Sequence, residues 1–385
     1  ININFQHNTI WRRTPLYLAC REGHVEIVKL LLKNQKVDRN RASQTEETPF
    51  YIACFNGQVE IIKLLLKDER VDVNKAENEY HKTPFWIACF NGSTEVVKLL
   101  LNDERIEVNK ENVEGQTPFY IACRFGYTEI VKLLLSDERI EINKADKNDK
   151  TPFHIACWKG HTEVVKLLLN DERMEVNEEN YGDSYDRTSF LIACRKGYLE
   201  IVKLLLNDKR IDIKKADNCD ETPFYTACFN EHIEIVKLLL KDNRIDLNKS
   251  NRFGWTPFYT ACKKGSTEIM KLLLNDQRVN INKTSKYGIT PFWIACENGH
   301  LGIVEYLLAS RRDINSNAKS DEGKTAIDIA KERKKESRYW FKNEEDFQKR
   351  TKIFVDIVEL LESFEINPNE TRTKLRIKLG LAGNF

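Results

Sequence analysis

The chain has 385 residues, of which 41% are hydrophobic and 31% charged, a balance typical of a folded protein rather than a disordered one. Its 61 basic and 59 acidic side chains leave a formal net charge of +2, which excludes a global field that would attract nucleic acid or an anionic membrane. The longest apolar runs are far shorter than the ~20 residues of a membrane span, and the first residues show no signal-peptide pattern.

Residues 1–13 are predicted to be the tail end of a preceding or partial repeat, because residues 1–4 look like the last residues of the units that follow. The chain does not begin with Met, so we expect a piece of a longer protein. From residue 14 a motif beginning with Thr recurs every 34 to 37 residues, which indicates a stack of similar units. Its starts are Thr14, Thr48, Thr83, Thr117, Thr151, Thr188, Thr222, Thr256, Thr290 and Thr325.

One unit illustrates how the repeat is built. Thr117 is predicted to cap a short helix by accepting from backbone N–H groups, and Pro118 suits the first helical position, where no donor is lost. Gly126 ends this helix because it can adopt a positive φ. A second helix follows over 129–135, and the polar residues 136–150 form a loop or hairpin to the next unit. One such pair of helices cannot bury both apolar faces, whereas stacked pairs can.

The run Thr-Pro-aromatic-x-x-Ala-Cys, then Gly, then Glu-(Ile/Val)-Val-Lys-Leu-Leu-Leu, then (Asp/Glu)-Val-Asn closely resembles the ankyrin repeat. The resemblance covers nearly all of residues 14–330, with nine clear units and one weak one. It implies an all-α solenoid, in which helix-turn-helix units with hairpin loops stack into a curved superhelix. The first helices would lie on the concave side, and the hairpin tips would project.

Two departures from the family pattern matter. Most units have 34 residues rather than 33, with the extra residue in Asn-Asp-Glu-Arg after the Leu run. The family's usual His after Thr-Pro survives only at His154 and is elsewhere Tyr or Trp, so the polar contacts that this His makes between repeats are in question. We interpret the replacements as packing residues: Tyr17, Tyr51, Trp86, Tyr120, Tyr225, Tyr259 and Trp293.

The two residues between Cys and Gly vary from unit to unit, whereas the residues that recur at fixed positions, here called the frame, stay the same. This contrast makes the two variable residues the candidate binding positions. The resemblance places them on the concave groove. They are aromatic in the early units and increasingly basic in the later ones, which suits an extended partner segment with apolar and acidic parts. The alternative is that the aromatics pack on neighbouring repeats. The candidates are Phe55, Phe90, Arg124, Phe125, Trp158, Lys159, Arg195, Lys196, Phe229, Lys263 and Lys264.

Residues 14–324 are predicted to form nine ankyrin-type repeats, 325–366 a degenerate capping repeat, and 367–385 a tail. A basic helix over 371–381 of the tail could dock on a partner, a membrane surface or the solenoid itself, or the tail could be flexible. The loop 178–187 is three residues longer than its equivalents, so it is either a binding loop or a neutral insertion. The aromatics Tyr339, Trp340 and Phe341 lie in a charged insertion of the last unit.

Nothing in the sequence points to chemistry. It contains no phosphate-binding or dinucleotide-binding glycine motif, no HExxH and no CxxC, so we expect no catalytic residues, no cofactor and no metal. Nine of the ten cysteines recur at one repeat position, which indicates buried thiols and an intracellular, cytoplasmic or nuclear location. Cys219 falls in a predicted loop tip. The recurring His24, His161, His232 and His300 are interpreted as structural.

We therefore expect a non-catalytic scaffold or adaptor, monomeric on its own, that binds protein partners through the groove and hairpin tips. Acidic loop residues such as Asp103 and Glu104 argue against nucleic acid as a ligand. Two alternatives stay open. The chain could be a structural component of a larger assembly, or the regulatory module of a longer protein that carries an enzymatic part.

Overall fold

The computed structural model describes residues 4, 12–177, 188–335 and 343–381, and these ranges contain 21 helices and no strand. The prediction of an all-α stack of helix-turn-helix units is confirmed. The chain divides into two compact units: unit 1 comprises residues 1–193 with 203–211, and unit 2 comprises 194–202 with 212–385. The predicted loop 178–187 and the aromatics Tyr339, Trp340 and Phe341 lie outside the described residues.

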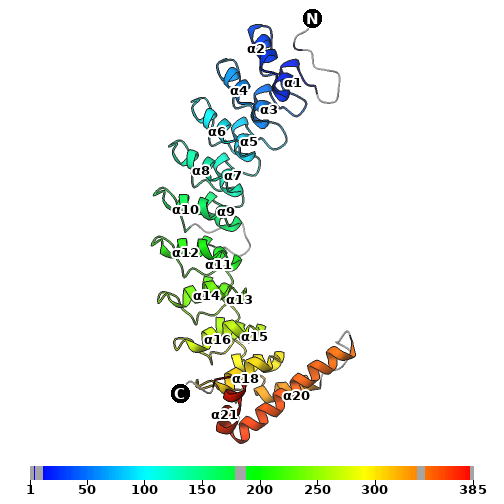
Figure 1. The fold of residues 1–385 in the computed structure, drawn as a ribbon, viewed down its shortest axis with the longest axis vertical. Helices are drawn as coiled ribbons and strands as arrows, with labels where there is room; N and C mark the ends of the chain where they lie inside the picture. Colours follow the sequence, from blue (N-terminus) through cyan, green and yellow to red (C-terminus); the bar gives the residue numbers. More distant parts are fainter. Residues whose placement is uncertain (1–3, 5–11, 178–187, 336–342, 382–385) are drawn as a thin grey trace. The chain divides into compact units, whose positions relative to one another are not determined.

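Each repeat contributes a first and a second helix, which Figure 1 shows as pairs stacked in chain order within each unit. The pairs of unit 1 are α1 (Pro15–Glu22) and α2 (Val25–Lys33), α3 (Pro49–Phe55) and α4 (Val59–Leu66), α5 (Pro84–Phe90) and α6 (Thr94–Leu101), α7 (Pro118–Phe125) and α8 (Thr128–Leu135), and α9 (Pro152–Lys159) and α10 (Thr162–Leu169). α11 (Ser189–Lys196) and α12 (Leu199–Asn207) contribute residues to both units.

Unit 2 continues the same pattern and ends in three helices that depart from it. Its pairs are α13 (Pro223–Phe229) and α14 (Ile233–Leu240), α15 (Pro257–Lys264) and α16 (Thr267–Asn275), and α17 (Pro291–Asn298) and α18 (Leu301–Ala309). The last helices are α19 (Ala326–Lys334), α20 (Glu344–Ile366) and α21 (Pro368–Lys378).

The first helices begin as the residue pattern predicts. Thr117 is extended, and its hydroxyl accepts a hydrogen bond of 3.1 Å from the backbone N–H of Tyr120, while Pro118 occupies the first turn. Ala122 and Cys123 are fully buried where neighbouring first helices pack on one another. Their small side chains permit this close approach, so the repeat cysteines serve packing.

The glycine that follows most first helices has two structural reasons, although Glu231, with φ of 61°, takes its place after α13. Gly126 has φ of 74°, and an added Cβ would lie 2.5 Å from the His161 ring of the next repeat. Nε2 of His161 in turn lies 2.9 Å from the carbonyl oxygen of Arg124, in the last turn of α7. Equivalent contacts join His232 to Arg195 and His300 to Lys263, so these histidines have the structural role expected of them.

Several aromatics that replace the family's histidine bond the first helix of a repeat to the loop that leads into the next one. The Tyr17 hydroxyl donates to the Glu47 carboxylate at 2.7 Å, and the Tyr120 hydroxyl donates to Asp146 at 3.0 Å. The Trp86 indole N–H donates to the carbonyl of Gln116 at 2.9 Å. Because these rings are otherwise buried, the hydrogen bond satisfies their one polar atom.

A ladder of asparagines ties the loops together. The Asn74 amide donates to the carbonyl of Arg105 at 2.7 Å and accepts from the N–H of Glu107 at 2.9 Å. The same pair of bonds recurs in both units, so each loop is paired with the backbone of the next repeat. The asparagines that make both bonds are Asn4, Asn40, Asn74, Asn109, Asn143, Asn248 and Asn282.

The residues around the extra position of the repeat form a clamp. In the Asn-Asp-Glu-Arg segment, Arg105 makes an ion pair of 2.6 Å with Asp103. It also donates to the carbonyl of Leu66, the last residue of α4, which is the second helix of the preceding repeat. Arg139 and Arg173 repeat both contacts one and two repeats later. A cation at a helix C-terminus satisfies an unpaired carbonyl and the negative end of the helix dipole.

The C-terminal basic helix docks on the stack. It spans Pro368–Lys378 rather than 371–381, and it packs against α18 and α20. Arg372 and Arg376 donate to the carbonyls of Leu308 and Ala309, and Lys378 pairs with Glu305 at 2.6 Å. In the structure this helix docks on the solenoid itself, which is one of the alternatives left open by the sequence.

We expect Gly126→Ala to lower the midpoint of urea unfolding, corresponding to a loss of about 2 kcal/mol, because the new methyl group meets His161 and the backbone has positive φ. The matched control is Gly302→Ala in α18, where an added Cβ meets nothing within 4 Å. That change should stabilise the helix by up to about 1 kcal/mol. Equal midpoints for the two variants would contradict the Gly–His contact.

The aspartates of the clamp predict a dependence of stability on pH. The Arg139 guanidinium lowers the pKa of Asp137, and Arg173 does the same for Asp171. Since the folded-state pKa lies below that of the unfolded chain, this stabilisation is complete above the unfolded value of about 3.9 and is lost as pH falls through the folded value.

The double variant Asp137→Asn, Asp171→Asn should therefore lose about 1 kcal/mol at neutral pH and lose less than the unchanged chain on acidification below about pH 5. Urea unfolding followed by circular dichroism at several pH values measures both effects. Glu138→Gln with Glu172→Gln, which alters exposed neighbours in the same loops, is the control. Parallel pH profiles for all three proteins would refute the assignment.

Candidate protein-binding surface

The predicted site residues lie at the C-terminal ends of the first helices. Four phenylalanines there are well exposed for aromatic side chains: Phe55 by 44%, Phe90 by 37%, Phe125 by 41% and Phe229 by 39%. Trp158, Arg124, Arg195 and Lys263 are half-buried, while Lys159, Lys196 and Lys264 are exposed. The frame positions beside them, Ala and Cys, are buried in every full repeat, so the variable residues are what the first helices present to solvent.

Unit 1 brings some of these aromatics together. Phe90 stacks on Trp86 with ring centroids 5.3 Å apart, and its ring meets Phe125 edge-on at 5.2 Å. Phe125 in turn stacks on Tyr127 at 5.9 Å. Phe55 makes no such ring contact among the described residues. These aromatics therefore pack partly on neighbouring repeats and remain partly exposed, and their role in binding a partner stays a prediction.

Trp158 belongs to a separate pair. Its ring stacks on His154 at 6.5 Å, and the Lys150 ammonium lies 5.6 Å from the indole centroid. This indole therefore contacts a ring of its own helix and lies near a cation.

In unit 2 two of the basic candidates, Lys263 and Lys264, lie on aromatic rings. The Lys264 ammonium is 4.3 Å from the centroid of Phe229, and the Lys263 ammonium is 3.4 Å from that of Trp255. Burial lowers the pKa of Lys263, and nearby Glu297 opposes that shift. Arg195 lies 3.9 Å from the Glu221 carboxylate. Lys263 is thus a partly desolvated cation held on an aromatic face.

Sequence reasoning missed a second set of exposed aromatics at the hairpin tips. Tyr80 is 42% exposed, Phe253 38% and Tyr287 58%. Each lies three residues before the Thr that opens a first helix, and this shared position in an otherwise polar loop was the available signal. The tips are joined by backbone hydrogen bonds, for example from Lys286 N–H to the carbonyl of Phe253 at 3.1 Å.

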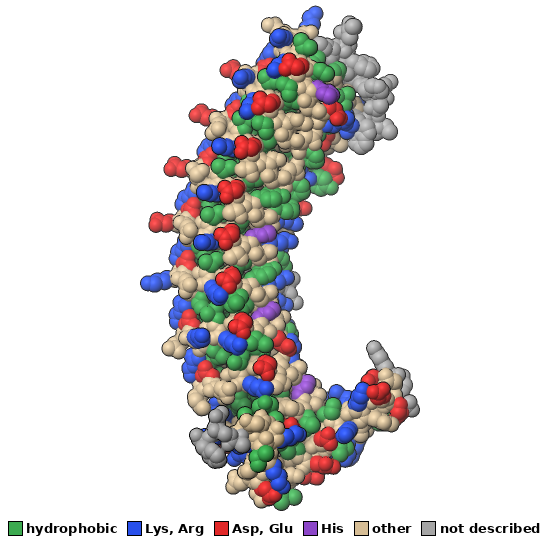
Figure 2. All heavy atoms as spheres, in the orientation of Figure 1, with side chains coloured by type: hydrophobic (Ala, Val, Ile, Leu, Met, Phe, Trp, Pro, Cys, Tyr) green, Lys and Arg blue, Asp and Glu red, His purple; other side chains and the backbone are tan. Residues whose placement is uncertain are grey.

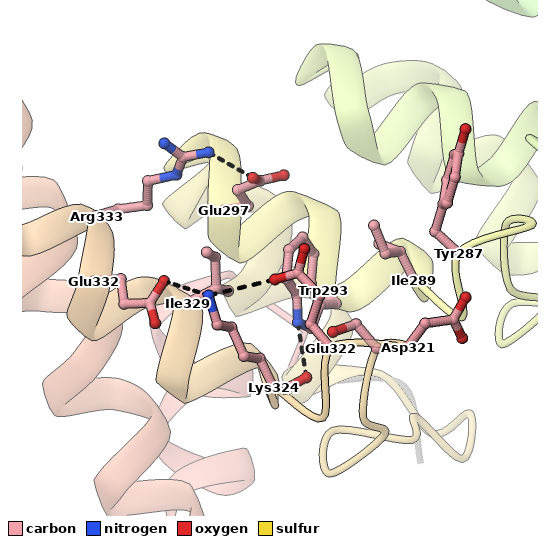
Figure 3. A pocket seen from close by; sticks show the side chains of 11 residues that line it. Tyr287, Ile289, Trp293, Glu297, Asp321, Glu322, Lys324, Ile329, Glu332 and Arg333 are labelled. Carbon is pink, nitrogen blue, oxygen red and sulfur yellow. Dashed lines mark hydrogen bonds and ion pairs between the residues drawn. The ribbon is translucent and has the colours of Figure 1, made fainter.

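A pocket of about 470 Å³ lies in unit 2 between the last full repeat and the cap. Figure 3 shows side chains from the loop before α17, from α17 itself, from the loop 320–324 and from α19 converging on it. Since these segments are separated in the chain, no local motif reveals the pocket. Its lining residues are Tyr287, Ile289, Trp293, Glu297, Ser320, Asp321, Glu322, Lys324, Ile329, Glu332 and Arg333.

The described residues contain no cluster of three or more His, Cys, Asp or Glu able to hold a metal ion. Burial raises the pKa of the repeat thiols, to about 12 at Cys20 and Cys157, so these cysteines are poor nucleophiles. Cys219 is half-buried in its loop. No described helix is long and apolar enough to cross a membrane. Figure 2 shows basic and acidic side chains interspersed over each unit.

A family model described as ankyrin repeats in three copies matches residues 1–77, 69–146, 138–217, 190–285, 224–320 and 277–338. No curated protein sequence matches the chain. Ankyrin repeats are generally protein–protein interaction modules, and their fold is typically non-catalytic. The family match spans most of the chain and agrees with the stacked helix pairs and with the buried frame, and the chain therefore belongs to the ankyrin-repeat family.

Proposed function

We propose that this chain is a non-catalytic protein-binding scaffold, which takes a partner segment along the ends of its first helices and its hairpin tips. The observation that supports this most strongly is the contrast within each repeat. The frame residues are buried, whereas in each repeat from α3 to α15 one position places a large aromatic or basic side chain at the surface. Exposed aromatics of this kind are typical of the anchors that contribute most of the binding energy at interfaces.

The state of these anchors supports the same proposal. Phe90 and Phe125 are already held by ring stacking, and Phe229 lies under the Lys264 ammonium. A side chain that is ordered before binding loses less conformational entropy when a partner covers it. Basic groups beside the rings suit a partner segment that combines apolar and acidic residues. The chain itself is proposed to act as a monomer, without cofactor or metal.

We also propose an intracellular, cytoplasmic location. The nine repeat cysteines are buried thiols rather than disulfides, which is typical of proteins in reducing compartments.

The test is an affinity capture from the source cell with quantitative mass spectrometry, using the full chain and the variant Phe55→Ala, Phe90→Ala, Trp158→Ala, Phe229→Ala. We expect recovery of a specific partner to fall at least about tenfold in the variant, because each truncated anchor removes 1 kcal/mol or more of binding energy. Circular dichroism must show that the variant keeps its helical content.

The matched control changes four exposed apolar residues outside the groove: Ile27→Ala, Leu30→Ala, Ile366→Ala and Ile377→Ala. This control should recover the partner as the unchanged chain does. If the groove variant retains the partner, or if the control loses it equally, binding does not take place through the ends of the first helices.

A further inference from the structure

We propose that the pocket between the last full repeat and the cap binds an arginine side chain of an extended protein segment. This inference rests on the proposed function, and it names one residue type of the partner and the place where that residue is recognised.

The shape of the pocket suits a long side chain with an apolar stem and a polar end. Its volume of about 470 Å³ falls within the range of ligand-binding pockets. In Figure 3, Tyr287 and Ile289 lie on the side opposite Glu332 and Arg333, and Trp293 lies between them. The apolar groups could therefore contact the methylene stem while the carboxylates contact the charged end.

The charge of the pocket is negative and incompletely balanced. Four carboxylates line it, from Glu297, Asp321, Glu322 and Glu332, with only the cations Lys324 and Arg333. Lys324 lies 2.9 Å from Glu332 and 3.4 Å from Glu322, and Arg333 pairs with Glu297 at 2.5 Å. Asp321 is exposed and makes no ion pair within the described ranges. Two negative charges thus exceed the resident cations, and a guanidinium would offset part of this excess.

A second observation also points to a ligand. Ser320 lines the pocket with a side chain that is 9% exposed, and its Oγ has no hydrogen-bond partner. The equivalent Ser285, one repeat earlier, accepts from the N–H of Tyr287 at 3.2 Å. A buried hydroxyl without a partner costs free energy, so an N–H donor arriving from a ligand gains a hydrogen bond that the chain itself does not make.

Arginine fits this site better than lysine does. Its planar guanidinium presents five donors in a fork that can bond two carboxylates at once, and it can also lie against an aromatic side chain such as Tyr287. The surface one repeat earlier is basic, because Lys263 and Lys264 end α15. The partner is therefore expected to carry this arginine within an otherwise acidic and apolar segment rather than within a basic one.

The test uses short fluorescent peptide pools with the full chain, read out by fluorescence polarisation. The flanks are a fixed mixture of Ala, Asp, Glu, Leu, Phe and Ser. The central residue is arginine in one pool and lysine, citrulline or glutamate in the others. Citrulline has nearly the shape of arginine without its charge. We expect the arginine pool to bind about tenfold more tightly than the citrulline pool, and more tightly than the lysine pool.

The pocket variant Asp321→Asn, Glu322→Gln should lose this preference for arginine. The control Glu234→Gln, Glu268→Gln removes the same charge from two lysine-paired carboxylates on α14 and α16 and should keep it. Ser320→Ala should weaken arginine binding about threefold, while the midpoint of thermal unfolding stays the same or rises, because the lost hydroxyl has no partner.

Equal binding of the arginine and citrulline pools would overturn the inference, as would an arginine preference that survives the pocket variant. Absence of binding by every pool would overturn it too. These outcomes are separate from the proposed function, which depends on the phenylalanine groove variant. That variant should keep the arginine preference in the pool assay even where it loses its cellular partner.

Discussion

The structure depends on the contact between each repeat and the next. A repeat of two short helices cannot bury its own apolar faces, so its core is completed only where both helices, including the Ala-Cys surface of the first, pack on the neighbouring repeat. The Gly126–His161 contact shows how tight this arrangement is, because the ring occupies the space that any Cβ at position 126 would need. The same His161 ring hydrogen-bonds the carbonyl of Arg124 near the end of α7. One side chain of the next repeat therefore both packs against Gly126 and satisfies a backbone carbonyl.

Polar groups determine how the neighbours are aligned. Each Asn of the ladder bonds a backbone carbonyl and a backbone N–H of the next repeat, and each clamp Arg reaches the end of the preceding second helix. A shift between repeats would break these bonds together and leave partly buried groups without partners. The aromatic replacements of the family's histidine add a bond, through their hydroxyl or indole N–H, from the first helix to the loop that leads into the next repeat.

Contacts between repeats engage many polar and apolar side chains of the frame. The side chains that stay exposed are the ones available for function. In the full repeats the exposed residues include those on the second helices, at the ends of the first helices and at the hairpin tips, and the last two sets include exposed Phe, Tyr and Lys side chains. The cap differs, because Lys324, Glu332 and Arg333 stand where it meets the last full repeat. The pocket therefore arises where the repeat pattern ends, and its excess of carboxylates contrasts with the basic end of α15.

The sequence by itself determined the period, the two helices of each repeat, the Thr cap and the Gly terminus, because these depend on residues within a few positions of one another. It also identified Phe55, Phe90 and Phe229 as variable positions, which the structure places in the open. Only the tertiary structure decided that Phe90 stacks on Phe125, that Lys263 lies on Trp255, that α21 docks on α18, and that residues from 287 to 333 enclose a pocket. These features depend on contacts between neighbouring elements, and the order of residues along the chain does not specify the distances between such elements.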